Sequence, residues 1–233
     1  MSSRRTTLTP DRLALLRWTV AIGAVTADAL AYRETTTVAS ARAKLNRAAG
    51  DGLLTATRPL TNRPALYTAT SAGVRASGST GLGPARVSAA GAQHMIACAH
   101  VAAALERDYP EGSLMGEREL RHRERIVRAP VASAVLSGAG HRGPLLHRPD
   151  LVVWPAAGTK GLPLAVEVEL TIKAPRRLAE ICRAWARSRH VEAVLYLAPA
   201  AVGRALERAI ASARAGERIV VVPLEALPLR IDL

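Results

Sequence analysis

Four charged residues in two neighbouring segments have the types and spacing to hold a metal ion beside a phosphodiester. Asp150 lies in HRPDLVVWP, and Glu167, Glu169 and Lys173 lie in LPLAVEVELTIK. Alternate residues of a strand point to the same face, so Glu167 and Glu169 project side by side. If the strand that begins at Asp150 pairs with this one as a hairpin, Asp150 approaches Glu167.

Carboxylate oxygens at this spacing predict a magnesium site. Mg²⁺ prefers oxygen ligands and usually takes one or two protein carboxylates, with waters and substrate phosphate completing the shell. We therefore expect Asp150 and Glu167 to bind Mg²⁺, and we expect neither zinc nor a nucleotide cofactor. The alternative is that Glu167 and Glu169 form the solvated face of a half-buried strand and that Asp150 is a turn residue.

Composition favours a polyanionic partner. The 233 residues carry a formal net charge of +13, from 32 Lys and Arg against 19 Asp and Glu. Arginine suits bidentate contact with phosphate, although a GC-rich genome would also enrich it. Two isolated cysteines, Cys98 and Cys182, indicate a reducing compartment without structural zinc. With no signal peptide or membrane span expected, the chain is predicted to be cytoplasmic.

Residues 1–77 are predicted to form three helices followed by a hairpin. The first helix opens at TPDR with Thr9 as its cap, and the second spans 26–31. The third lies in TTVASARAKLNRAAGDG. Its expected apolar stripe consists of Val38, Ala41, Leu45 and Ala48. The runs LLTATRPL and PALYTATSAG then read as two strands joined by a basic turn.

This order resembles a winged helix-turn-helix. The likeness lies in the small-residue second helix, the GDGLL step and the LYTATSAG exit, which is similar to the LYxLTxxG exit of winged-helix regulators. The resemblance implies that the third helix enters the major groove of duplex DNA while the wing contacts backbone. It nominates Thr36, Thr37, Ser40, Arg42, Lys44 and Arg47 for the groove, and Arg58 and Arg63 for the wing. The alternative is a winged helix used for protein contacts or dimerisation.

The remainder is predicted to be an α/β domain, so that the chain is α+β overall. A linker at 78–85 precedes a domain over 86–233, which starts with a long helix at about 87–107. GERELRHRERIVR reads as a helix whose charges face solvent or phosphate. Helices and strands then alternate to the end of the chain, which predicts a mixed sheet flanked by helices.

With PD on one strand and ExE on the next, this domain resembles the PD-(D/E)XK nuclease superfamily and its restriction-endonuclease-like fold. Together with the winged helix and the ERELR segment, it is similar to the replication-relaxation family of plasmids and mobile elements. The resemblance implies catalytic roles for Asp150, Glu167, Glu169 and Lys173. Glu169 stands where the pattern has lysine, so either Glu169 or a displaced Lys173 takes that role, or the two merely pair.

Two functions from different classes remain open. In the first, the protein is a Mg²⁺-dependent endonuclease that docks on double-stranded DNA and cleaves or nicks it. In the second, it is a DNA-binding regulator or replication accessory whose nuclease-like domain is inactive and serves dimerisation or partner contact. A third possibility is a protein-interaction adaptor with no nucleic-acid role, which would show no binding to duplex DNA at low salt. A homodimer is expected in the first two cases, because winged helices often read paired half-sites.

Overall fold

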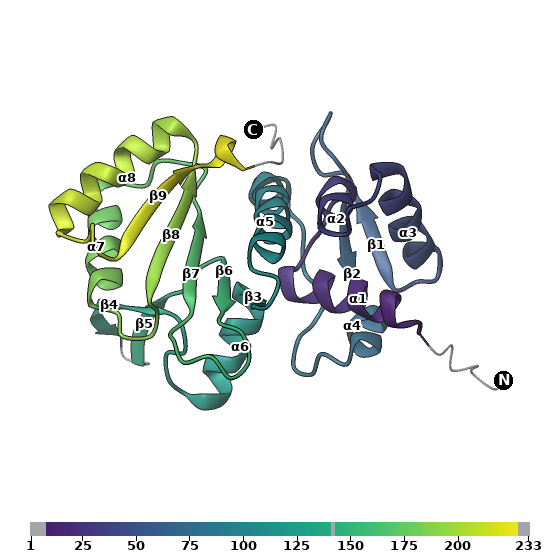
Figure 1. Cartoon of the computed structure of the whole chain (residues 1–233), viewed down its shortest axis with the longest axis horizontal. Helices are drawn as coiled ribbons and strands as arrows, with labels where there is room; N and C mark the ends of the chain where they lie inside the picture. Colours follow the sequence, from purple (N-terminus) through teal and green to yellow (C-terminus); the bar gives the residue numbers. More distant parts are fainter. Residues whose placement is uncertain (1–7, 141–142, 228–233) are drawn as a thin grey trace. The chain divides into compact units, whose positions relative to one another are not determined.

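The computed structural model of the chain describes residues 8–140 and 143–227. The chain divides between Ile96 and Ala97 into two compact units. The division lies within helix α5 (Ala89–Asp108), which follows the expected linker at 78–85. Helices combined with a five-stranded mixed sheet confirm the predicted α/β class (Figure 1).

Among the described residues of the first unit, four helices before α5 are each preceded by a threonine. They are α1 (Pro10–Ile22), α2 (Ala27–Arg33), α3 (Val38–Gly50) and α4 (Ser71–Ser77). The preceding residues are Thr9, Thr26, Thr37 and Thr70, and each side-chain oxygen accepts a hydrogen bond from a backbone N–H of the first turn. A cap of this kind contributes about 1 kcal/mol, which helps to fix where each short helix begins.

A two-stranded hairpin lies between α3 and α4. β1 (Leu54–Thr57) pairs antiparallel with β2 (Leu66–Ala69), and an isolated bridge adds Val25 to Tyr67 of β2. Gly73 of α4 allows this helix to lie against the hairpin entry, because a Cβ atom there would lie 2.0 Å from the carbonyl oxygen of Leu53. From Pro10 to Ser77 the first unit thus has three helices, a hairpin and a further helix.

The second unit is built on a sheet with the strand order β3-β6-β7-β8-β9. The strands are β3 (Ser113–Gly116), β6 (Leu151–Trp154), β7 (Leu164–Val168), β8 (Ala193–Ala198) and β9 (Ile219–Pro223). β3, β6 and β7 pair antiparallel, and β7, β8 and β9 pair parallel. The predicted hairpin is therefore confirmed as β6 and β7, with Leu151 opposite Val166.

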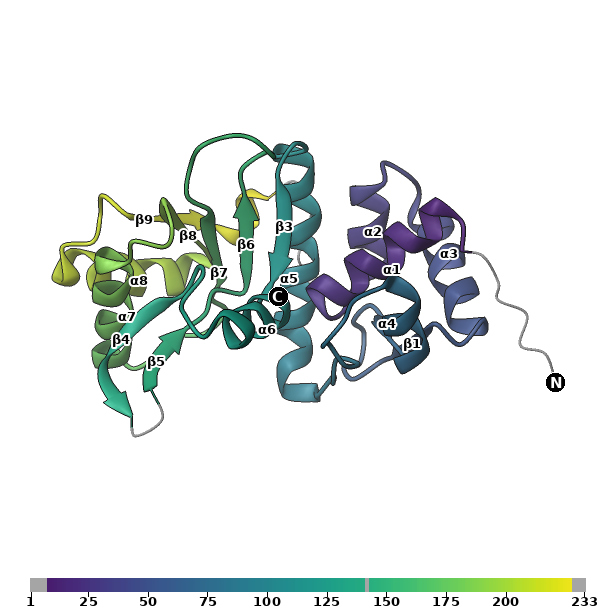
Figure 2. The same ribbon diagram turned by 90° about the horizontal axis from the view of Figure 1, so that it is seen from below.

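Helices and a second hairpin complete this unit. α7 (Pro175–Arg187) and α8 (Ala200–Ala213) lie side by side against the sheet (Figure 2). α6 (Glu117–Val127) follows β3 directly, and a short 3-10 helix η1 (Leu224–Ala226) follows β9. β4 (Ala134–Gly140) and β5 (Gly143–His147) form a separate hairpin that contacts α7. The core of the unit contains Trp185, Tyr196, Leu206 and Ile181.

The structure corrects some details of the sequence prediction. Val38 is 40% exposed, so the buried stripe of α3 is formed by Ala41, Leu45 and Ala48 alone. The helix predicted in GERELRHRERIVR is present as α6, but one of its charged residues, Glu124, is buried. Neither α4 nor the β4–β5 hairpin follows from the sequence patterns. The residues of both lack a clear apolar period.

Candidate functional site

The pairing of β6 with β7 brings Asp150 beside Glu167, as the sequence predicts. Asp150 immediately precedes β6, and its Oδ2 accepts a hydrogen bond of 2.8 Å from the backbone N–H of Val168. The backbone N–H of Glu117 donates to the Asp150 carbonyl oxygen at 2.9 Å. Asp150 is thus anchored both to the neighbouring strand and to the start of α6.

Glu167 in β7 and Glu169, which directly follows β7, do not lie on a solvated face. Glu167 is 5% exposed and Glu169 is 6% exposed, so the alternative of a half-buried strand with a wet face is wrong. α7 covers the face that carries Ala165 and Glu167, because Ala165 packs in one core cluster with Trp185 and Leu178. An ionised carboxylate buried in this way is costly unless a positive partner compensates it.

His147 lies beside the Glu167 carboxylate, and the sequence analysis did not predict this contact. Nε2 of His147 lies 2.7 Å from Oε1 of Glu167, although neither atom makes an aligned hydrogen bond. The ring packs edge-on against Trp185, with centroids 5.8 Å apart. The only sequence signal is its place three residues before Asp150 in HRPD, which gains meaning once β5 is known to end at His147.

Burial is the main influence on the protonation of Glu167. It raises the pKa of this carboxyl, and the nearby His147 opposes the shift. The charge of Asp150 raises the pKa further, whereas that of Lys173 lowers it. Asp150 and Glu167 are therefore close enough for their charges to repel, and a cation between them would relieve both the repulsion and the cost of burial.

Lys173 returns to the carboxylates from the segment after β7. Its Nζ forms an ion pair with Oε2 of Glu169. Burial lowers the pKa of Lys173, and the charges of Glu167 and Asp150 raise it again. The four predicted residues therefore belong to one cluster, in which Glu169 and Lys173 also pair directly with each other.

The donor set fits a hard divalent cation that keeps part of its water shell. Asp150 and Glu167 supply carboxylate oxygens, which Mg²⁺ prefers. Within the described ranges, the ligand atoms of Asp150, Glu167 and Glu169 do not all lie within 4.8 Å of one another, so they do not form an enclosed cage. Mg²⁺ commonly takes one or two protein carboxylates, with waters and substrate phosphate as its other ligands.

A thiol also lies near Asp150. The Sγ atom of Cys98, a buried residue of α5, is within 4.8 Å of a carboxylate oxygen of Asp150. Thiolate is a soft ligand that favours zinc over magnesium. Cys98 is therefore the residue to vary when metal preference at Asp150 is tested.

Uncharged groups lie beneath Glu167. Tyr196 stands opposite Glu167 in the β7–β8 pairing, and Cys182 belongs to α7. Burial, followed by the charge of Glu167, raises the pKa of Cys182 to about 11 and that of Tyr196 well above its ordinary value. Both groups stay protonated and uncharged near neutral pH, so neither adds a negative charge beside Glu167.

In the first unit, the residues nominated for DNA contact are mostly accessible. Thr36, Thr37, Ser40, Arg42, Arg47 and Arg58 are exposed. Thr37 is partly engaged as the cap of α3, where its Oγ1 accepts from the N–H of Ser40 at 3.1 Å. Lys44 is half-buried, and its Nζ pairs with Glu34 at 2.6 Å. Arg63 is half-buried in the connection between β1 and β2.

Comparison with known proteins adds no relative: no family model matches the chain, and the searches of curated proteins and of solved structures found no match. Within residues 8–140 and 143–227, no helix is both long and apolar enough to cross a bilayer.

Proposed function

We propose that the protein binds duplex DNA through its first unit and cleaves or nicks DNA with Mg²⁺ at the cluster of Asp150, Glu167, Glu169 and Lys173. One observation carries the proposal. Lys173, displaced from the usual lysine position, lies in the same electrostatic cluster as two buried or anchored carboxylates. The likeness of the second unit to PD-(D/E)XK nucleases, and of the whole chain to replication-relaxation proteins of plasmids and mobile elements, belongs to this proposal.

Each residue then has a distinct role. Asp150 and Glu167 would hold Mg²⁺, which would lower the pKa of a water and stabilise charge on the phosphate. Lys173 orients the attacking water, and Glu169 positions Lys173 through their ion pair. His147 restrains Glu167, since its Nε2 lies beside the Oε1 atom.

Plasmid cleavage tests this function. Supercoiled plasmid with Mg²⁺ or Mn²⁺ should be nicked or linearised, and Asp150→Ala or Glu167→Gln should slow the reaction roughly 100-fold or more. Glu207→Gln is the matched control, because Glu207 is an exposed carboxylate on α8. Cleavage that survives both site variants, or is lost equally in the control, would eliminate the site. Cys98→Ser with a panel of metals shows whether the thiol near Asp150 alters the preference.

DNA binding is tested separately in EDTA. Arg42→Ala combined with Arg47→Ala should weaken binding of duplex DNA and reduce the slope of log affinity against log salt by about 2. Lys44→Ala should have a smaller effect, because Glu34 already holds its ammonium group. Unchanged binding in the double arginine variant would move the interface away from α3.

A second function is favoured by the pairing of Glu169 with Lys173. If that ion pair is structural, the second unit is an inactive nuclease-like domain, and the protein is a DNA-binding regulator or replication accessory. In that case wild-type protein binds DNA but does not cut it with any divalent metal. We also propose a homodimer, which sedimentation equilibrium tests directly.

A further inference from the structure

We infer that a pocket lined by α6, the segment after it and the end of β5 binds the phosphate group of a nucleotide; its lining includes no residue of the carboxylate cluster. The pocket has a volume of about 380 Å³. Its lining includes four arginines: Arg121, Arg125, Arg128 and Arg148. The inference goes beyond the proposed cleavage, because it holds equally for a chain that binds nucleic acid without cutting it.

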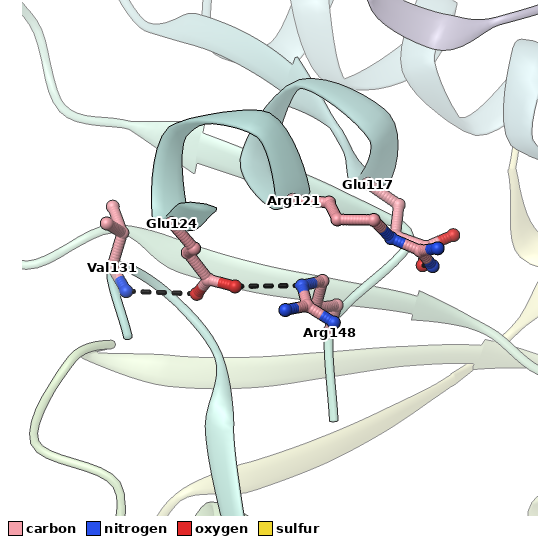
Figure 3. Close-up of polar contacts among 5 residues, drawn as sticks. All are labelled: Glu117, Arg121, Glu124, Val131 and Arg148. Carbon is pink, nitrogen blue, oxygen red and sulfur yellow. Dashed lines mark hydrogen bonds and ion pairs between the residues drawn. The ribbon is translucent and has the colours of Figure 1, made fainter. Parts of the chain in front are cut away.

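A buried carboxylate fixes one of these arginines. Glu124 is 3% exposed, and its Oε2 accepts a hydrogen bond of 2.8 Å from Nε of Arg148. Its Oε1 accepts from the backbone N–H of Val131 at 3.0 Å. Figure 3 shows Glu124 held between Val131 and Arg148. Arg148 is thus oriented by the hydrogen bond from its Nε. Its two terminal amino groups take no part in that hydrogen bond.

The remaining charge of the pocket is positive. Glu124 is neutralised by Arg148, and Arg121 forms an ion pair with Glu117 of the same helix. Arg125 contacts His122, with 3.1 Å between Nη2 and Nδ1, and Arg128 is exposed at the end of α6. Two arginines without a carboxylate partner among the described contacts therefore stand beside the oriented Arg148.

Phosphate is the group that this arrangement recognises best. Guanidinium groups present planar pairs of N–H donors that match phosphate oxygens, and several converging on one anion favour a multiply charged group. The pocket exceeds the size of phosphate alone, and Ala129, Pro130 and Leu146 add an apolar part to its lining. A phosphate with an attached organic group, such as a nucleotide in DNA or free in solution, fits both features.

Binding in metal-free buffer tests the pocket independently of cleavage. With EDTA present, deoxyadenosine monophosphate and a short DNA duplex are titrated in parallel, with deoxyadenosine as the control that lacks phosphate. The double variant Arg125→Ala with Arg128→Ala should weaken binding of a phosphate-bearing probe about tenfold or more. Both arginines are exposed, so the variant is expected to fold.

The matched control removes the same charge elsewhere. Arg204→Ala with Arg208→Ala acts on exposed arginines of α8, which do not line the pocket. A selective loss with the mononucleotide identifies a free nucleotide as the ligand, and a selective loss confined to the duplex identifies DNA phosphate. Equal losses in the two double variants, binding of deoxyadenosine as tight as that of its monophosphate, or no binding of either phosphate-bearing probe would each overturn the inference.

Discussion

Two buried glutamates of the second unit have opposite surroundings. Both carboxylate oxygens of Glu124 are occupied, one by Arg148 and the other by the N–H of Val131. Glu167 is equally buried, but Oε1 has only the unaligned contact with His147, and burial raises its pKa. Glu124, whose two oxygens both accept hydrogen bonds, therefore stabilises the fold. Glu167, which lacks such partners and lies near Asp150, is instead suited to bind a cation.

The largest expected effect concerns the satisfied glutamate. Glu124→Ala leaves the partly exposed guanidinium of Arg148 and the N–H of Val131 without their partner, and losing these two hydrogen bonds costs about 3 kcal/mol. The free energy of unfolding, measured in urea, should fall by that amount. Glu180→Ala is the control, because Glu180 forms a partly exposed pair with Arg177 on α7. Equal losses in the two variants would show that Glu124 is no more important than a surface pair.

Replacing Glu167 should stabilise the protein when metal is absent, whereas replacing Glu124 should destabilise it. The folded pKa of Glu167 is raised by burial, so the proton it binds stabilises the fold, and this contribution is lost as pH rises through the raised pKa. Glu167→Gln should therefore stabilise the protein in EDTA by about 1–3 kcal/mol at pH 8. Below the ordinary pKa of glutamate, about 4.3, the difference should disappear.

Unfolding of wild type and Glu167→Gln across this pH range measures the effect. Glu124→Gln serves as the comparison, because Glu124 already has two partners. A wild-type protein that is more stable than Glu167→Gln at pH 8 would mean that Glu167 is compensated within the fold, as Glu124 is.

The smallest effect uses Cys182 as a reporter of the charge on Glu167. Burial raises the pKa of this thiol to about 11, and the charge of Glu167 raises it as well. Cys182 is fully buried, so its ionisation is followed by NMR of its Cβ carbon, which needs no reagent. At pH 8 roughly one thiol in a thousand should be ionised. Glu167→Gln should move the titration slightly to lower pH, and Glu124→Gln should not. Equal titrations in both variants would contradict the assignment.

Much of the fold follows from local patterns, and the environment of the acids does not. The Thr9 cap, the β6–β7 hairpin and the proximity of Asp150 to Glu167 can be predicted, because turn residues and alternation are local signals. The burial of Glu167 on a strand covered on both faces depends on α7, which lies later in the chain. Alternation alone cannot reveal whether a second layer covers the polar face.

The two most informative partners were also invisible in the sequence. His147 reaches Glu167 only because the β4–β5 hairpin ends beside α7, and Glu124 is buried because Arg148 and Val131 converge on it from outside its helix. In sequence, Glu124 is one of many charges in GERELRHRERIVR. Such long-range partners are set by tertiary packing, so residue spacing could not distinguish the buried charge from the solvated ones.

We expect the incompletely compensated Glu167, together with Asp150, to bind a divalent cation. The most direct test is thermal unfolding of wild type, Glu167→Gln and Glu124→Gln with and without Mg²⁺ at constant ionic strength. A cation that binds only the folded state at 100 times its dissociation constant adds about 2.7 kcal/mol. Wild type and Glu124→Gln should gain stability from Mg²⁺, and Glu167→Gln should gain none. An equal gain in all three proteins, or no gain in wild type, would contradict the account.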